Sequence, residues 1–209
     1  VFMNRGFNRG RAAEIVAREL ERAGLTRDAL ELVQAVLKKG GRRLRNRRLL
    51  MRRAIQYASH LREPQEMLKY ARSYAKDRGN QVTAWTEAAG FLDEQHHPIL
   101  AVTLIDEGME KWPSNSELQV ARGHYLLEMG RKAAAERDFS DALAKSTSVA
   151  ATMKEIRRVL GAGSYQRLLA RMEKLARAFQ PGRTDGYLTL GAVLAASGDL
   201  LAAKRAFTR

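Results

Sequence analysis

Hydrophobic residues recur along this chain every three to four positions, which is the spacing of amphipathic helices. The first two segments of this kind have their apolar positions at Ala13, Val16 and Leu20, and then at Leu30, Val33 and Leu37. Apolar residues at i, i+3, i+4 and i+7 give a helix a single stripe to bury. Because one pair of short helices cannot bury two stripes by itself, neighbouring pairs are expected to stack.

The helical pattern is itself repeated at a longer, constant interval. Two series of positions follow this interval: Trp85, Gln119, Met153 and Tyr187, and Leu92, Leu126, Leu160 and Leu194. The interval matches the period of about 34 residues that is typical of a two-helix unit. The sequence therefore predicts an all-α fold of antiparallel helix pairs.

Two segments carry a resemblance to a known family. The first has Gly123, Leu126, Gly130, Ala135, Phe139 and Ala142 on signature positions, and the second has Tyr187, Leu190, Gly191, Leu194, Gly198, Ala203 and Phe207. Both segments resemble the tetratricopeptide repeat, and weaker matches extend the resemblance over nearly the whole chain. The resemblance implies a single right-handed superhelical solenoid over residues 1–209, with about six repeats at 10–43, 48–81, 82–115, 116–149, 150–183 and 184–209.

Small residues and glycines have a physical place in such a repeat. Gly123, Ala135 and Gly191 are expected to let paired helices approach closely. Gly130 and Gly198 are expected to supply the permissive backbone of the turn between two helices. The resemblance also implies a concave face that is formed mainly by the first helix of each pair.

A run of basic residues interrupts the regular spacing. Gly24 and Gly130 are 106 positions apart, four more than three periods, so about four residues are inserted between them. Residues 38–53 span the expected junction and contain nine Lys or Arg in sixteen positions, without one acidic residue. Two interpretations stay open: a patch that binds phosphate or carboxylate groups through Arg, or a solvated loop and helix start.

Candidate partner-binding residues come from two sources. The resemblance places one set on the groove-facing side of first helices: Arg18, Arg22, Arg52, Arg53, Gln56, His124 and Arg158. The basic run adds a second set: Arg42, Arg43, Arg47 and Arg48. All are hypotheses for contacts to an acidic partner, because the net charge of +14 favours anions.

The sequence predicts no catalytic, metal or cofactor site. His60 and His124 are isolated, and His96 and His97 precede Pro98 in a predicted turn, so the histidines lack the spacing of a metal site. Gly161 and Gly163 lack the Lys that a phosphate-binding loop would add. We therefore expect a protein that is not an enzyme and needs no cofactor.

Composition sets outer limits on the class of protein. Apolar residues make up 45% of the chain, enough for a sizeable core, and no apolar stretch approaches the roughly 20 residues of a membrane-spanning helix. There are no cysteines, which excludes disulfides and thiolate metal sites but leaves the compartment open between bacterial periplasm and cytoplasm. Because Val1 opens the chain and Arg209 falls within a helical pattern, we expect a piece of a longer polypeptide.

Three functions compete at this point. The leading one is a scaffold for protein–protein interaction through the concave groove and a basic edge, in a bacterial assembly or secretion complex such as exopolysaccharide export. The second is direct binding of a polyanion, RNA or an acidic polysaccharide, by the basic run, which would weaken steeply with salt. The third is oligomerisation, including a homodimer, through an open C-terminal edge at Phe207.

Overall fold

The computed structural model describes residues 9–41, 44–77, 81–160, 165–170, 185–196 and 198–208. Within these ranges the chain forms helices and no strand, so the predicted all-α class is confirmed. None of the helices in these ranges combines the length and the hydrophobicity that crossing a bilayer requires. The chain divides into two compact units, residues 1–105 and 106–209. The single solenoid stays a prediction, and each unit is described by itself.

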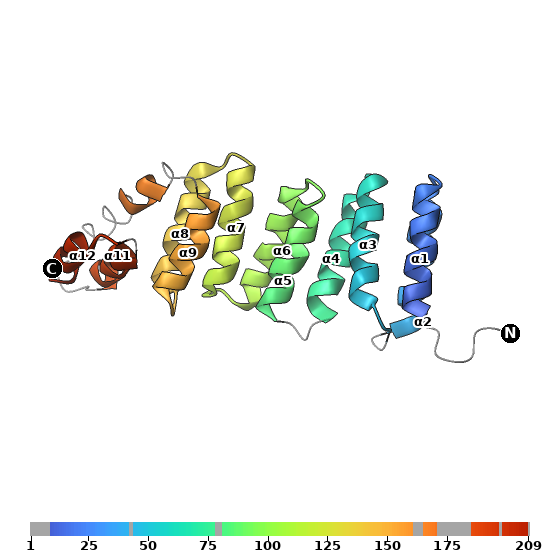
Figure 1. Ribbon diagram of the computed structural model, residues 1–209, viewed down its shortest axis with the longest axis horizontal. Coiled ribbons are helices and arrows are strands. Elements are labelled where there is room, and N and C mark those ends of the chain that lie inside the picture. The colour runs from blue at the N-terminus through green and yellow to red at the C-terminus, as the bar shows by residue number, and fades with distance from the viewer. Residues whose placement is uncertain are drawn as a thin grey trace. The chain divides into compact units, whose positions relative to one another are not determined.

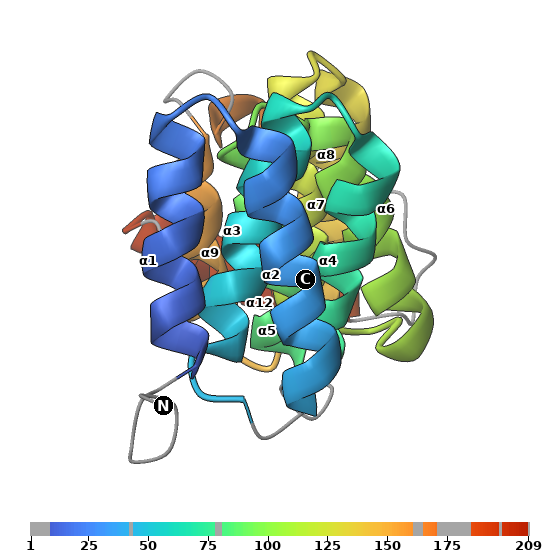
Figure 2. The same ribbon diagram turned by 90° about the vertical axis from the view of Figure 1, so that its right-hand side faces the viewer.

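The N-terminal unit is built from helical hairpins. Its helices are α1 (Arg9–Arg22), α2 (Thr26–Gly40), α3 (Arg47–His60), α4 (Pro64–Asp77), α5 (Val82–Asp93) and the first half of α6 (Pro98–Lys111). Each helix packs against the next from α1 to α5, and α1 and α5 also contact α3 (Figure 1). Seen along the row, α1 and α3 lie on one side and α2 and α4 on the other (Figure 2). The first helices of the pairs therefore share one face.

The core of this unit lies where the apolar stripes of α1 to α5 meet. Leu30 and Val33 of α2 are fully buried, as their spacing predicts. Tyr57 of α3 and Trp85 of α5 are the largest buried side chains of the unit. Because aromatic residues bury large areas, these two side chains contribute a large share of the apolar surface that the unit buries.

The C-terminal unit contains a second set of hairpins. Its helices are the second half of α6, α7 (Ser116–Glu128), α8 (Lys132–Lys145), α9 (Val149–Val159), α11 (Asp185–Ala196) and α12 (Leu200–Phe207), and residues 165–170 are also helical. Two of these helices have an N-cap side chain. Asn115 accepts a hydrogen bond from the Leu118 amide at the start of α7, and Asp199 accepts one from the Ala202 amide at the start of α12, both at 3.0 Å. These two caps fix where α7 and α12 start.

Glycine sets the distance between paired helices in this unit. A Cβ atom on Gly123 of α7 would lie 2.5 Å from the Phe139 ring of α8, and one on Gly191 of α11 would lie 2.6 Å from the Phe207 ring of α12. No side chain fits at such a distance. The predicted close approach at these two glycines is confirmed, and each pairs with an aromatic residue of the following helix.

Left-handed backbone marks the turn after α1, α3, α5, α7 and α11. Gly130 and Gly198 have φ of 72° and 90°, which confirms their predicted role, while Arg62 and His96 adopt φ of 59° and 61° at the equivalent turns. Arg62, His96 and Gly130 follow one another at the constant interval of the repeat, but Gly24, with φ of 79°, precedes Arg62 by four positions more. The four extra residues therefore lie between Gly24 and Arg62, the interval that contains the whole basic run.

Candidate partner-binding surface

The first helices of the N-terminal unit are joined by polar side chains. Arg53 of α3 donates to Oε1 of Gln56 at 2.9 Å, and its Nη2 lies 3.8 Å from Oε1 of Glu14 on α1. Glu14 also lies 3.5 Å from Arg18, one turn along α1. Gln56 in turn donates to Glu21 at 3.2 Å. Three predicted site residues, Arg18, Arg53 and Gln56, are thus brought together in one network between α1 and α3.

The same network covers a buried phenol. Tyr57 is fully buried, its hydroxyl has no hydrogen-bond partner, and burial followed by the nearby Glu21 carboxylate raises the pKa of Tyr57. The Nε of Arg53 is also buried without a hydrogen-bond partner. His60 lies at the end of the network, with Nδ1 3.4 Å from Glu21. The polar contact between α1 and α3 therefore leaves two hydrogen-bonding atoms unused.

Arg52 occupies the neighbouring position between α3 and α5. Its guanidinium lies 4.7 Å from the Phe91 ring centroid and donates to Oε2 of Glu94 at 2.7 Å. Phe91 is held edge-on against Tyr74 with ring centroids 5.0 Å apart, and the Tyr74 hydroxyl lies 2.8 Å from a Glu87 carboxylate oxygen. Cation–π contact and hydrogen bonding together orient the Arg52 guanidinium while half of the side chain stays exposed.

A cavity of about 320 Å³ opens beside Arg52. Its lining comes from α3 and from the end of α5 with the turn that follows: Leu49, Arg52, Arg53, Ile55, Gln56, Phe91, Glu94 and Gln95. Among the described residues that line it are two guanidinium groups, two side-chain amides and one carboxylate. Such a lining can donate hydrogen bonds to carboxylate and backbone carbonyl oxygens of a bound segment.

The basic run is less available than its sequence suggests. Arg47 turns inward: Nε donates to Asp77 at 3.0 Å, and Nη1 donates to the carbonyls of Leu37 and Gly41 at 3.1 Å each. Arg48 is exposed. Arg42 and Arg43 lie outside the described residues. The run therefore includes an arginine that stabilises the junction between α2, α3 and α4.

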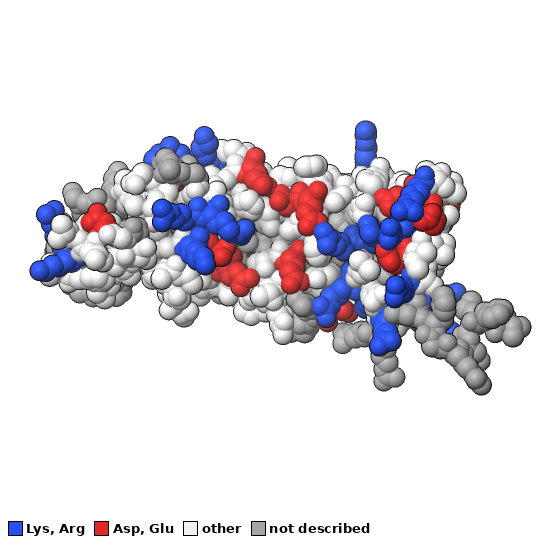
Figure 3. Space-filling view, in the orientation of Figure 1, with Lys and Arg blue, Asp and Glu red and all other residues white. Residues whose placement is uncertain are grey.

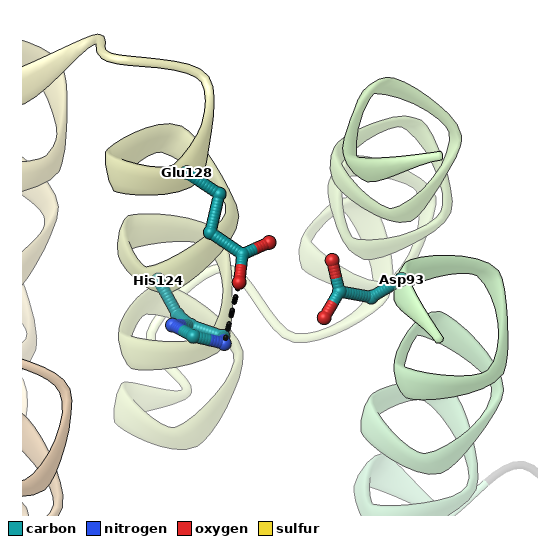
Figure 4. Close-up of side chains that lie close together, drawn as sticks. All are labelled: Asp93, His124 and Glu128. Carbon is teal, nitrogen blue, oxygen red and sulfur yellow. Dashed lines mark ion pairs between the residues drawn. The ribbon is translucent and has the colours of Figure 1, made fainter. Parts of the chain in front are cut away.

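The remaining predicted positions form local pairs. Arg22 donates to Glu19 on α1 at 2.6 Å, and Arg158 donates to Glu155 on α9 at 3.1 Å. In the C-terminal unit, Nε2 of His124 lies 3.6 Å from Oε1 of Glu128, one turn along α7 (Figure 4). Exposed pairs of this kind contribute little to stability and leave their side chains accessible.

One charged cluster was missed by the sequence interpretation. Arg122 of α7 donates hydrogen bonds to both carboxylate oxygens of Asp138 on α8, each at 2.7 Å. It also donates to Asp106 on α6 at 2.8 Å. The Asp138 side chain is 6% exposed. Hydrogen bonding to Asp138 raises the pKa of Arg122. The only sequence signal was an aspartate directly beside the core residue Phe139. The cluster joins α6, α7 and α8.

Charge on the first-helix face of the N-terminal unit is mixed. Lys and Arg side chains alternate with Asp and Glu over α1 and α3 (Figure 3). The described residues of this face offer guanidinium, amide and aromatic groups, which suit recognition of a peptide. This arrangement of paired helices, with a repeat spacing and glycine–aromatic contacts, is the all-α fold that the tetratricopeptide resemblance implies.

The known proteins that match this chain are solved structures of low sequence identity. No protein-family model matches the chain, and no curated protein matches it. Among solved structures, MamA is 16% identical over 74% of this chain and 90% of that chain, with a TM-score of 0.38. A tetratricopeptide repeat protein from Parabacteroides merdae is 16% identical over 96% and 91%, with a TM-score of 0.40. PilW, a widely conserved type IV pilus biogenesis factor, is 16% identical over 94% and 90%, with a TM-score of 0.39.

Proposed function

We propose that this chain is a non-catalytic scaffold that binds an acidic segment of a protein partner on the first-helix face of its N-terminal unit. The observation that carries the proposal is the cavity between α3 and α5, where Arg52 is stacked on Phe91 and faces the opening beside Arg53 and Gln56. Arg presents N–H groups in a fixed fork that matches a carboxylate. An acidic side chain that enters the cavity would compete with Glu94 for Arg52.

The side-chain amides of the cavity favour a peptide ligand over a polyanion such as RNA or an acidic polysaccharide. Gln56 and Gln95 can each donate to and accept from a peptide backbone, which a phosphate chain cannot use in both senses. Arg47, Arg52 and Arg53 are already within 3.8 Å of acidic groups, so the basic run offers less uncompensated charge than nine cations in sequence imply. The process that we propose is a bacterial assembly or secretion complex such as exopolysaccharide export.

The test is selection of a displayed peptide library against the full chain. We expect the selected peptides to be rich in Asp and Glu, and to bind the double variant Arg52→Gln, Arg53→Gln about tenfold more weakly, because two charge-assisted contacts are lost. Lys76→Gln on α4 is the matched control, because it removes an exposed charge from a second helix of the same unit. It should change binding by less than about twofold.

Two results would count against the scaffold. Peptides that bind the double variant as well as the original chain would exclude the α3–α5 cavity as the site. The polyanion alternative would be favoured if no acidic peptide is selected and the chain binds a single-stranded oligonucleotide with an affinity that falls steeply in moderate salt.

A further inference from the structure

The C-terminal unit has a basic surface that the proposed function does not use. On α9, Lys154 and Arg157 are exposed, and in the described part of the chain neither has an acidic partner. Arg158 beside them is paired with Glu155 at 3.1 Å. Figure 3 shows Lys and Arg side chains gathered over α9. Uncompensated cations on one helix face attract anions, so this surface is a candidate for a second contact.

Two cavities adjoin these cations, and both are lined by Arg157 and Tyr165. The first, of about 400 Å³, is lined by Arg157, Leu160, Tyr165, Gln166, Leu169, Leu194 and Asp199. The second, of about 460 Å³, is lined by Ala150, Met153, Lys154, Glu155, Arg157, Arg158, Tyr165 and Ala196. Cavities of this size fall in the range that binds small ligands and short peptide segments.

Arg157 is oriented by an aromatic ring and not by an acid. Its guanidinium carbon lies 5.7 Å from the ring centroid of Tyr165, which is 8% exposed and forms a wall of both cavities. A cation–π contact holds the guanidinium over the ring face and leaves its N–H edge available to bind a carboxylate. Arg157 is therefore placed to bind an anion without first breaking an ion pair.

The acids among the described residues that line the cavities are already engaged. Asp199 accepts the Ala202 amide as the N-cap of α12, and Glu155 accepts from Arg158. The rest of the lining is largely apolar, with Leu160, Leu169 and Leu194 in the first cavity. An apolar lining does not suit a sugar–phosphate backbone, whereas it suits aliphatic side chains that flank an acidic one.

We infer that α9, the helical residues 165–170 and α11 form a second docking site, which takes a peptide segment carrying an acidic residue between apolar ones. The carboxylate binds Arg157 and Lys154, and the flanking side chains enter the two cavities. This inference stands on the C-terminal unit alone and does not require the proposed site between α3 and α5.

The experiment measures binding of a fluorescein-labelled peptide of alternating Glu and Leu to the full chain by anisotropy. Arg157→Gln should weaken binding about fivefold or more, because it removes a cation–π-oriented contact to the carboxylate. The matched control Arg137→Gln removes an exposed charge from α8 of the same unit and should change binding by less than about twofold. Arg157→Gln is also compared with a triple variant that adds Arg52→Gln and Arg53→Gln. Any further loss of binding in the triple variant measures the peptide bound at the N-terminal unit.

Two further peptides decide the chemistry. A Gln–Leu peptide tests the need for charge and a Glu–Gly peptide tests the need for apolar flanks, and both should bind at least about fivefold more weakly than Glu–Leu. The inference is overturned if Arg137→Gln weakens binding as much as Arg157→Gln, or if the Glu–Gly peptide or an oligonucleotide of equal charge binds as well as Glu–Leu. Equal melting temperatures of Arg157→Gln and the original chain exclude misfolding as the cause of lost binding.

Discussion

Arg47 and Arg52 of α3 and Arg157 of α9 have opposite relations to their neighbours. On α3, Arg47 and Arg52 donate to Asp77 and Glu94, acids that stand 30 and 42 positions away in sequence. On α9, Arg157 is oriented by Tyr165, only eight positions along the chain, and no described acid pairs with it. The basic run therefore contains arginines that are paired with acids from other helices, whereas Arg157 of α9 is not paired with an acid in the described part of the chain.

This difference shows why local charge density is a poor guide to a binding surface. In a stacked array of helices, each first helix lies beside another that is about one period away, so its partners come from outside any sequence window. Residues 38–53 contain no acid, yet the fold brings acids to three of their arginines, Arg47, Arg52 and Arg53. Stability measurements can therefore separate arginines that hold the fold from cations that stay available.

The largest expected effect is at the most buried pair. Arg122→Met should lower the free energy of unfolding by about 3–5 kcal/mol, because the nearly buried Asp138 carboxylate would lose its bidentate partner. Arg137→Met, an exposed change on α8, should cost less than about 0.5 kcal/mol. Urea denaturation followed by circular dichroism measures both, and a loss below about 1 kcal/mol for Arg122→Met would show that the cluster is not structural.

A smaller loss is expected at Arg47. Arg47→Met removes one charge-assisted hydrogen bond to Asp77 and two to backbone carbonyls, and should cost about 1.5–3 kcal/mol after partial hydration of the freed groups. Its neighbour Arg48 is exposed, so Arg48→Met is a control that keeps the same helix and the same charge change. Equal losses for the two variants in denaturation would contradict the inward role of Arg47.

The exposed pair at Arg52 comes next. Arg52→Gln should change the free energy of unfolding by at most about 1 kcal/mol, because the ion pair to Glu94 is half exposed on both sides. The same variant is expected to weaken binding of acidic peptides at the N-terminal unit. A large loss of stability in urea denaturation, without a change in peptide binding, would show that Arg52 stabilises the fold, as Arg47 does, and does not bind a partner.

The smallest effect is expected at Arg157. Arg157→Met should leave the free energy of unfolding within about 0.5 kcal/mol of the original chain, because the side chain is exposed and its contact to Tyr165 is a weak one. Thermal unfolding at low and high salt checks this. A clear destabilisation would mean that Arg157 stabilises the position of residues 165–170. Arg157 would then resemble Arg47 of α3 and would not be a freely available cation.

Much of the fold could be predicted from the sequence because equivalent residues recur at the same positions in successive repeats. The contact between Gly123 and Phe139 and the one between Gly191 and Phe207 could be read from matching positions two periods apart. At His96 the sequence predicted a turn but not its backbone conformation, which is left-handed without a glycine.

The site was less predictable because it depends on pairing. Nothing near Arg47 in sequence indicates Asp77, and nothing near Arg122 indicates Asp138, since both acids come from the following helix. The register pointed to Arg158 on α9, yet its neighbour Arg157 lines both cavities beside Tyr165. Positions within one helix turn cannot be separated without the rotation of the helix about its axis.

The polar contact between α1 and α3 has a consequence for cooperativity. In a row of repeats, the strength of each junction decides whether neighbours unfold together or one after another. Glu14, Glu21, Arg53 and Gln56 join α1 to α3 through ion pairs and hydrogen bonds that water can replace, whereas Trp85 of α5, farther along the unit, is almost fully buried. Unfolding of the N-terminal unit is therefore expected to start as the detachment of its first hairpin, while α3 to α5 remain folded.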